Sequence, residues 1–249
     1  EDTYCRIKDQ PCSLTIHAVC RFGADVSLLC DNVVNSDCSL IMWLHSRESF
    51  LNAIQEVFNG KVSVNSKRAK KLSVDADCSL HIHNVTAEDA GRYTCRILKH
   101  QNPFSDTDTY LSVLTSEYYS KPDRPVTIRC SLHTNEGPGN CRLFLNSEVH
   151  LSWMDETGRK LQGDSRYQLT GPRCDITLNM TFQKEDNNRK WTCTLTDKGK
   201  VKISIDFTFS GMCSCYHNFS INQSVNVHAK TQILKLFRKL YPQYSMLGK

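Results

Sequence analysis

Apolar and polar residues alternate with a period of two along several short stretches of the chain, which is the pattern of half-buried β-strands. Val26, Leu28 and Cys30 share one face of the first clear stretch. Residues 50–57 are ambiguous, because their apolar residues suit a short helix as well as a strand. The strands expected in the first half cover residues 14–19, 24–30, 40–44, 78–82 and 109–114.

The same pattern continues through the second half, where residues 200–209 alternate most cleanly. Many short alternating stretches separated by turn residues are typical of β-sandwiches. A chain of 249 residues is long enough for two such domains and a tail. We therefore expect an all-β fold of two sandwiches in tandem. The strands expected in this half cover residues 126–130, 149–153, 174–178, 190–195 and 200–209.

Residues 210–249 depart from the strand pattern. Between Ala229 and Tyr241, apolar residues recur at helical spacing, with lysines and arginines between them. One hypothesis is a basic amphipathic helix that lies on a membrane surface. The alternative, which we favour, is a loosely attached terminal helix or a disordered tail over residues 211–249.

The most specific motif is the run from Glu88 to Cys95, which has the form Asp-x-Gly-x-Tyr-x-Cys. Its four fixed positions hold Asp89, Gly91, Tyr93 and Cys95. Cys30 and Trp43 precede this run in the order and spacing that immunoglobulin domains show. Over most of its length, the chain therefore resembles the immunoglobulin superfamily.

This resemblance implies a disulfide between Cys30 and Cys95, with Trp43 packed across it. It also implies that Gly91 permits a tight turn and that the Tyr93 hydroxyl bonds to nearby backbone. The room for an extra strand at residues 50–57 favours a variable-type domain. We expect this domain to span residues 1–115, with a cysteine-rich lead-in over residues 1–23.

Residues 116–210 resemble a second immunoglobulin-like domain, nearer the constant type. The resemblance implies a disulfide between Cys130 and Cys193. Two departures stand out, because Trp191 occupies the place of the corner tyrosine and no glycine lies between Asp186 and Cys193. We therefore expect a remodelled corner in this domain.

A second pair of cysteines recurs in both halves. In each, one cysteine lies between the second strand and the tryptophan, and the other lies on the fifth strand at an inward position. This repeat predicts the disulfides Cys38–Cys78 and Cys141–Cys174, each stabilising its domain by about 4 kcal/mol. Five cysteines are left over, and an odd number favours an interchain disulfide over a metal site formed with His217. They are Cys5, Cys12, Cys20, Cys213 and Cys215.

Thirteen cysteines indicate an oxidising compartment outside the cytoplasm. Four acceptor sequences for N-glycosylation agree with this, at Asn84, Asn179, Asn218 and Asn222. No run approaches the roughly 18 apolar residues of a membrane span. We therefore expect an extracellular protein, either secreted or the ectodomain of a plasma-membrane protein.

The formal charge of +5 is scattered through both halves, which argues against nucleic-acid binding. The run Lys67–Lys71 is basic, and we interpret it as a solvated face rather than as a ligand site. By the resemblance, Lys71 is the basic residue that pairs with the corner residue Asp89. Because lysine lacks the guanidinium fork, this pair should contribute about 1 kcal/mol at most.

The run Asp77–Val85, its continuation into the corner, and Tyr110–Leu114 are similar to a tandem-immunoglobulin family of bony-fish surface proteins. Members of that family resemble leukocyte receptors and adhesion molecules. The resemblance implies a non-catalytic recognition protein whose variable-type domain binds a protein ligand or cell-surface partner. A disulfide-linked or non-covalent dimer is compatible with the leftover cysteine. The alternative is a secreted factor whose basic tail acts on membranes.

Within the variable-type domain, we expect contacts from the loop 100–108 and the strand before it. The candidate binding residues are Arg96, His100 and Phe104, the last of which supplies an apolar tip. No Ser/His/Asp set, carboxylate pair or phosphate loop occurs at motif spacing, so we expect no catalytic residue, cofactor or metal. His81 and His83 alternate with core residues and are expected to face outward.

Overall fold

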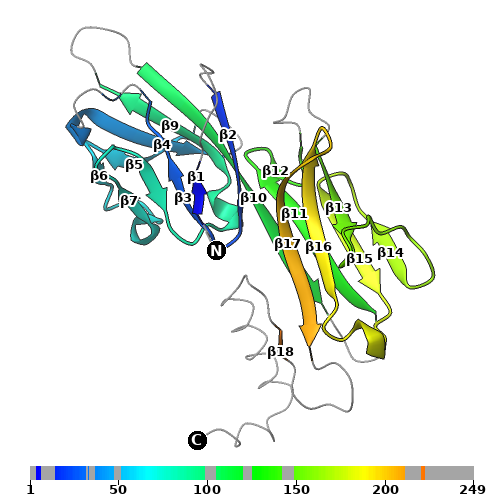
Figure 1. Ribbon diagram of the computed structural model, residues 1–249. Helices are drawn as coiled ribbons and strands as arrows, with labels where there is room; N and C mark the ends of the chain where they lie inside the picture. The colour runs from blue at the N-terminus through cyan, green and yellow to red at the C-terminus, as the bar shows by residue number, and fades with distance from the viewer. Residues whose placement is uncertain are drawn as a thin grey trace, which may run out of the picture.

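The computed structural model describes residues 4–6, 15–31, 33, 37–47, 52–98, 105–119, 125–141, 149–210 and 220–221. Most of these residues lie in β-strands or in the loops between them (Figure 1). Among them, helical segments are single 3₁₀ turns: η1 (Cys38–Leu40), η3 (Ala69–Lys71), η4 (Ala87–Asp89) and η5 (Lys184–Asp186). Within the same ranges, no helix has the length and apolar character needed to cross a membrane. The expected all-β fold is confirmed.

The first sandwich has two sheets. We call the smaller one the back sheet, and its strand order is β1 (Tyr4–Arg6), β3 (Asp25–Leu28), β8 (Leu80–Ile82), β7 (Leu72–Val74). The front sheet follows the order β2 (Thr15–Arg21), β10 (Ser105–Tyr119), β9 (Gly91–Ile97), β4 (Ile41–Ser46), β5 (Ile54–Phe58), β6 (Lys61–Val62). The additional strands β5 and β6 beside β4 are the arrangement of a variable-type sandwich.

The second sandwich is built from the following strands. One sheet has the order β14 (Tyr167–Thr170), β15 (Asp175–Met180), β11 (Val126–Thr134) and then β10, with β12 (Gly137–Pro138) paired to β11. The other has the order β13 (His150–Met154), β16 (Lys190–Asp197), β17 (Lys200–Ser210), β18 (Ser220–Ile221). Within the described residues, this grouping has the strand order of a constant-type sandwich.

Strand β10 belongs to both sandwiches. Its first part pairs with β9 and its second part with β11. Because side chains alternate across a strand, Leu111 and Val113 are buried in the first core, whereas Leu114 is buried in the second. Figure 1 shows this strand, in green, running from one sandwich into the other. The expected boundary between residues 115 and 116 therefore falls inside a continuous strand.

Most expected strands are present, with bounds that differ by a few residues. The ambiguous stretch 50–57 contains a strand, β5, rather than a helix. One detail is wrong, because Cys78 does not lie on the fifth strand but two residues before β8, with a φ of 65°. The expected tail lies outside the described residues except for the short strand β18.

Candidate functional site

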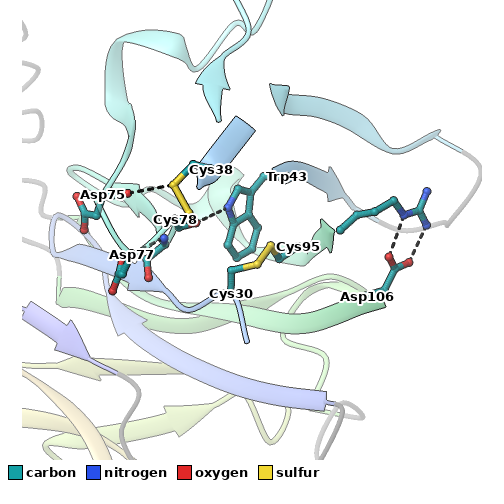
Figure 2. Close-up of a disulfide and its surroundings, with 10 residues drawn as sticks. Cys30, Cys38, Trp43, Asp75, Asp77, Cys78, Cys95 and Asp106 are labelled. Carbon is teal, nitrogen blue, oxygen red and sulfur yellow. Dashed lines mark hydrogen bonds and ion pairs between the residues drawn. A yellow bond between two sulfur atoms is a disulfide. The ribbon is translucent and has the colours of Figure 1, made fainter. Parts of the chain in front are cut away.

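Each sandwich contains two internal disulfides, and all four join the cysteine pairs that the sequence predicts. Their Cα–Cα distances of 5.6, 5.4, 6.5 and 6.0 Å lie in the normal range. The bonds are Cys30–Cys95, Cys38–Cys78, Cys130–Cys193 and Cys141–Cys174. Two of them lie on either side of the Trp43 ring (Figure 2). The buried indole Nε1 donates a hydrogen bond to the Cys78 carbonyl at 3.1 Å, so the second disulfide also places the acceptor for this tryptophan.

The corner of the first sandwich has the expected hydrogen bond, in which the Tyr93 hydroxyl donates to the Asp89 carbonyl at 2.8 Å. The reason for Gly91 differs from the expectation. A Cβ at this position would lie 2.5 Å from His45 Nε2 and 2.7 Å from the Ser46 carbonyl. Gly91 is therefore required because the strand passes directly over His45, rather than because the turn needs unusual backbone angles.

Arg68 is the largest departure from the sequence analysis. The basic run 67–71 was interpreted as a solvated face, but the Arg68 side chain is only 15% exposed. Its guanidinium donates to Asp89 Oδ1 at 2.9 Å, to the Tyr93 hydroxyl at 2.7 Å and to Glu56 Oε1 at 2.6 Å. Lys71 also contacts Asp89, as expected. The Asp89 carboxylate thus pairs with two cations. The arginine that contacts it, Arg68, lies three residues before Lys71, the position that the resemblance implies.

The surrounding polar groups are buried with Arg68. Glu56 accepts from the Ser66 hydroxyl as well as from Arg68. Burial would raise the pKa of Asp89, but hydrogen bonds from Lys71 and from the Thr86 backbone amide hold it below its ordinary value. The His45 ring stacks on Tyr93 with centroids 4.5 Å apart. Burial, assisted by the charge of Arg68, lowers the pKa of His45 to about 3, so this ring is neutral at physiological pH.

The second sandwich has its own corner pair, which the sequence analysis missed. Asp186 is fully buried and accepts from Arg166 Nη2 at 2.8 and 2.7 Å. Trp191, in the place of the corner tyrosine, is buried in the second core. The signal was present, since Asp186 precedes Cys193 by one residue more than Asp89 precedes Cys95.

The outer face of the front sheet presents three cross-strand rows, which we call the front face. In each row, residues opposite one another on neighbouring strands lie side by side. The rows are Met42–Arg96–Asp106, Leu44–Thr94–Asp108 and Arg92–Tyr110–His17. The alternate residues of these strands, such as Trp43 and Tyr93, face the core.

Opposite charges on the front face are matched. Arg96 Nε and Nη2 donate to the two Asp106 oxygens at 2.9 and 2.6 Å, and this bonding raises the pKa of Arg96. Asp108 accepts from Arg92 at 2.5 Å and from the Thr94 hydroxyl at 2.6 Å. The predicted contact residue Arg96 is therefore held in one orientation. The other two, His100 and Phe104, lie outside the described residues.

Two of the four glycan acceptors are described. Asn84 is exposed and follows β8 of the back sheet. Asn179 lies on β15 of the second sandwich, half-buried, where its side-chain oxygen accepts from the Thr127 hydroxyl at 2.6 Å. Asn218 and Asn222 lie outside the described residues.

The remaining cysteines are only partly placed. Cys20 is fully buried in the first core, and the backbone of Cys5 lies in β1. Cys12, Cys213 and Cys215 lie outside the described residues. The expected interchain disulfide therefore stays a prediction.

Comparison with known proteins finds a family model for part of the chain. Residues 21–114 match the family model for the immunoglobulin V-set domain. No curated protein matches the chain. Among solved structures, the chain is similar to the crystal structure of murine CEACAM1b, with 17% identity over 76% of this chain and 96% of that one and a TM-score of 0.34. The fold assignment rests on the strands and disulfides described above rather than on this likeness.

Proposed function

We propose that this chain, in which residues 21–114 form an immunoglobulin V-set domain, is a non-catalytic extracellular recognition protein that binds a protein partner through the front face. V-set domains are not an enzyme family, and immunoglobulin-type receptor domains typically bind other proteins. The observation that carries the proposal is the contrast between the two sheets. The front face has matched opposite charges and no glycan acceptor among its described residues, whereas Asn84 follows a strand of the back sheet.

The composition of the front face suits a protein interface. Arginine, tyrosine and methionine are enriched in interface cores, and the rows supply Arg92, Arg96, Tyr110 and Met42. The bidentate pair of Arg96 with Asp106 fixes both side chains before any partner arrives. Less side-chain freedom is then lost on binding. His100 and Phe104, which lie between β9 and β10 in the sequence, complete the proposal as further contact residues.

The remaining parts of the proposal concern the whole chain. We divide it into a V-set domain over residues 1–115, a constant-type domain over 116–210 and a tail over 211–249. We also propose that all four acceptor asparagines carry glycans and that the protein is secreted or lies on the cell surface. A dimer linked through one of the leftover cysteines is compatible with this proposal. The alternative, action of the basic tail on membranes, is tested separately by liposome binding of a peptide of residues 228–249.

The test places a new glycan on the front face. A cell-surface screen with the glycosylated protein first identifies a binding cell or protein. Arg92→Asn creates an Asn-Tyr-Thr acceptor in the row of Arg92 and Tyr110 on the front face and should abolish binding. Arg92→Gln removes the same ion pair without a glycan, and Gln168→Asn creates an Asn-Leu-Thr acceptor on the exposed part of β14. Gln168→Asn should keep full binding, and Arg92→Gln should lose less binding than the glycosylated Arg92→Asn protein. Full binding by the glycosylated Arg92→Asn protein would exclude the front face.

A further inference from the structure

Two histidines and an aspartate lie together on the back sheet, on the side of the first sandwich away from the front face. Asp25 begins β3, His81 is the middle residue of β8, and His83 directly follows β8. One ligand atom from each lies within 4.8 Å of the others. We propose that Asp25, His81 and His83 form a binding site for a divalent transition-metal ion of the zinc type.

The backbone explains why these three residues meet. Residues two apart on an extended segment share one side, so His81 and His83 project together and their rings lie 4.3 Å apart. In the antiparallel pair of β3 and β8, Val26 is opposite Ile82, which places Asp25 opposite His83. The expectation that both histidines are exposed is half right. His83 is exposed, but His81 is buried with 8% of its surface accessible, so the site combines one buried and one exposed histidine.

The separations between the three ligand atoms would suit a zinc ion if the ligands moved slightly closer together. His83 Nδ1 lies 3.3 Å from Asp25 Oδ2. A tetrahedral zinc ion with bonds of about 2.0–2.2 Å places its ligands roughly 3.3–3.6 Å apart. The cluster therefore needs movements of roughly 1–1.5 Å at its widest separation. The exposed side chains of His83 and Asp25 can supply them by rotation.

Neighbouring groups orient the ligands as second-shell partners do in metal sites. The Asn84 amide donates to Asp25 Oδ1 at 2.8 Å, which leaves Oδ2 directed at the histidines. The His83 amide donates to the Lys71 carbonyl at 2.8 Å and fixes the backbone of that ligand. Asp75 Oδ2, 3.8 Å from His81 Nδ1, adds a second negative charge. Together, Asp25 and Asp75 balance the charge of a divalent ion.

The donor set indicates the kind of metal. Imidazole nitrogen and carboxylate oxygen are ligands that zinc accepts, and two imidazoles disfavour calcium and magnesium. Three protein ligands leave a fourth position for water or for an atom of another molecule. In the absence of a metal, the pair of His83 with Asp25 is an exposed contact that contributes little stability.

The test titrates zinc chloride into the oxidised, full-length protein by calorimetry. His83→Ala and Asp25→Asn alter exposed side chains, and each should weaken zinc binding at least tenfold. His81→Ala should do the same, although this buried position also needs a folding check.

Two control variants separate this cluster from other histidines. His150→Ala changes a half-buried histidine on β13 of the second sandwich, and His217→Ala changes the histidine near the last two cysteines. Both should leave the affinity unchanged. The proposal is overturned if the wild-type protein binds no zinc, or if His83→Ala and Asp25→Asn bind it as the wild type does.

Discussion

Val113 and Leu114 are consecutive residues of β10, and both are fully buried, but Val113 lies in the core of the first sandwich and Leu114 in the core of the second. A single strand thus contributes its two sides to two different cores. The two sandwiches are joined by hydrogen-bonded strand rather than by a flexible linker. We expect the V-set domain and its neighbour to move as one body.

The two leucines of β10 test this shared strand. Leu111 and Leu114 are both fully buried, one in each core. Each change to alanine should cost about 2–5 kcal/mol, as for other buried leucines. Measured by amide hydrogen exchange, Leu111→Ala should weaken protection mainly in β3 and β8, and Leu114→Ala mainly in β15 and β16. The same exchange pattern for both variants would show that the two cores are not distinct.

Arg68 should be more important for stability than Lys71. Arg68→Met leaves Glu56 and Asp89 buried without their shared cation, and removing one partner of a buried pair costs about 3–5 kcal/mol. Lys71→Met should cost less, because Arg68 still contacts Asp89. Urea denaturation gives both values. Adding Glu56→Gln to Arg68→Met should recover part of the loss, and equal effects of Arg68→Met and Lys71→Met would refute this order.

His45 should make the protein sensitive to mild acid. Its pKa is lowered to about 3 in the folded state, whereas an unfolded histidine has a pKa of about 6.5. The unfolded state therefore binds the extra proton between these values, and stability falls as the pH decreases from about 6.5 toward 3, by up to about 1.4 kcal/mol per pH unit.

The control for this prediction is the variant His45→Gln, whose side chain does not take up a proton in this pH range. Free energies of unfolding are measured from about pH 7 to about pH 4. The difference between the wild type and the variant should shift in favour of the variant as the pH decreases. Arg68, Asp89, Arg47 and Glu56 surround the ring in both proteins, so their titration largely cancels. A difference that does not change with pH would mean that His45 is protonated without cost.

The disulfide Cys38–Cys78 should stabilise the V-set domain by about 4 kcal/mol. The double variant Cys38→Ala/Cys78→Ala should lower the melting temperature and increase the exposure of Trp43, whose indole bonds to the Cys78 carbonyl. The matching double variant, Cys141→Ala/Cys174→Ala, should leave Trp43 unchanged. Peptide mapping without reduction checks the pairing directly, and a link from Cys38 to Cys5, Cys12 or Cys20 would contradict it.

Strands could be predicted because their signal is local, and disulfides because the cysteine spacings resemble those of a known family and recur in both halves of the chain. The alternation of Val26 and Leu28 follows from strand geometry. The pairing of Cys30 with Cys95 follows from the resemblance of the Cys30, Trp43 and Cys95 spacing to that of immunoglobulin domains. The continuation of β10 could not be predicted in this way. Thr115, Ser116 and Glu117 directly after Leu114 are polar, so no apolar alternation marks this part of the strand, although Tyr118 packs against the second core.

The contacts of the buried polar groups could not be predicted from the sequence either. Arg68 stands in a run of charges, and only the turn η3 brings its side chain between Glu56 and Asp89. Likewise, Asp25 is distant in the chain from His81 and His83, and its place beside them depends on the pairing of β3 with β8. These contacts join residues that are far apart in the chain, so no motif of fixed sequence spacing can predict them.

Binding through the front face is tested most directly by exchanging the charges of its bidentate ion pair, Arg96 with Asp106. In the double variant Arg96→Asp/Asp106→Arg, the two charges trade places across β9 and β10, so an ion pair is retained and stability should change by about 1 kcal/mol or less. The matched control, Arg129→Asp/Asp175→Arg, exchanges the bidentate pair of the second sandwich. Affinity for the partner is measured by surface plasmon resonance. We predict at least a tenfold loss for the exchange of Arg96 with Asp106 and no change for the control. Unchanged affinity in the first variant would contradict binding through the front face.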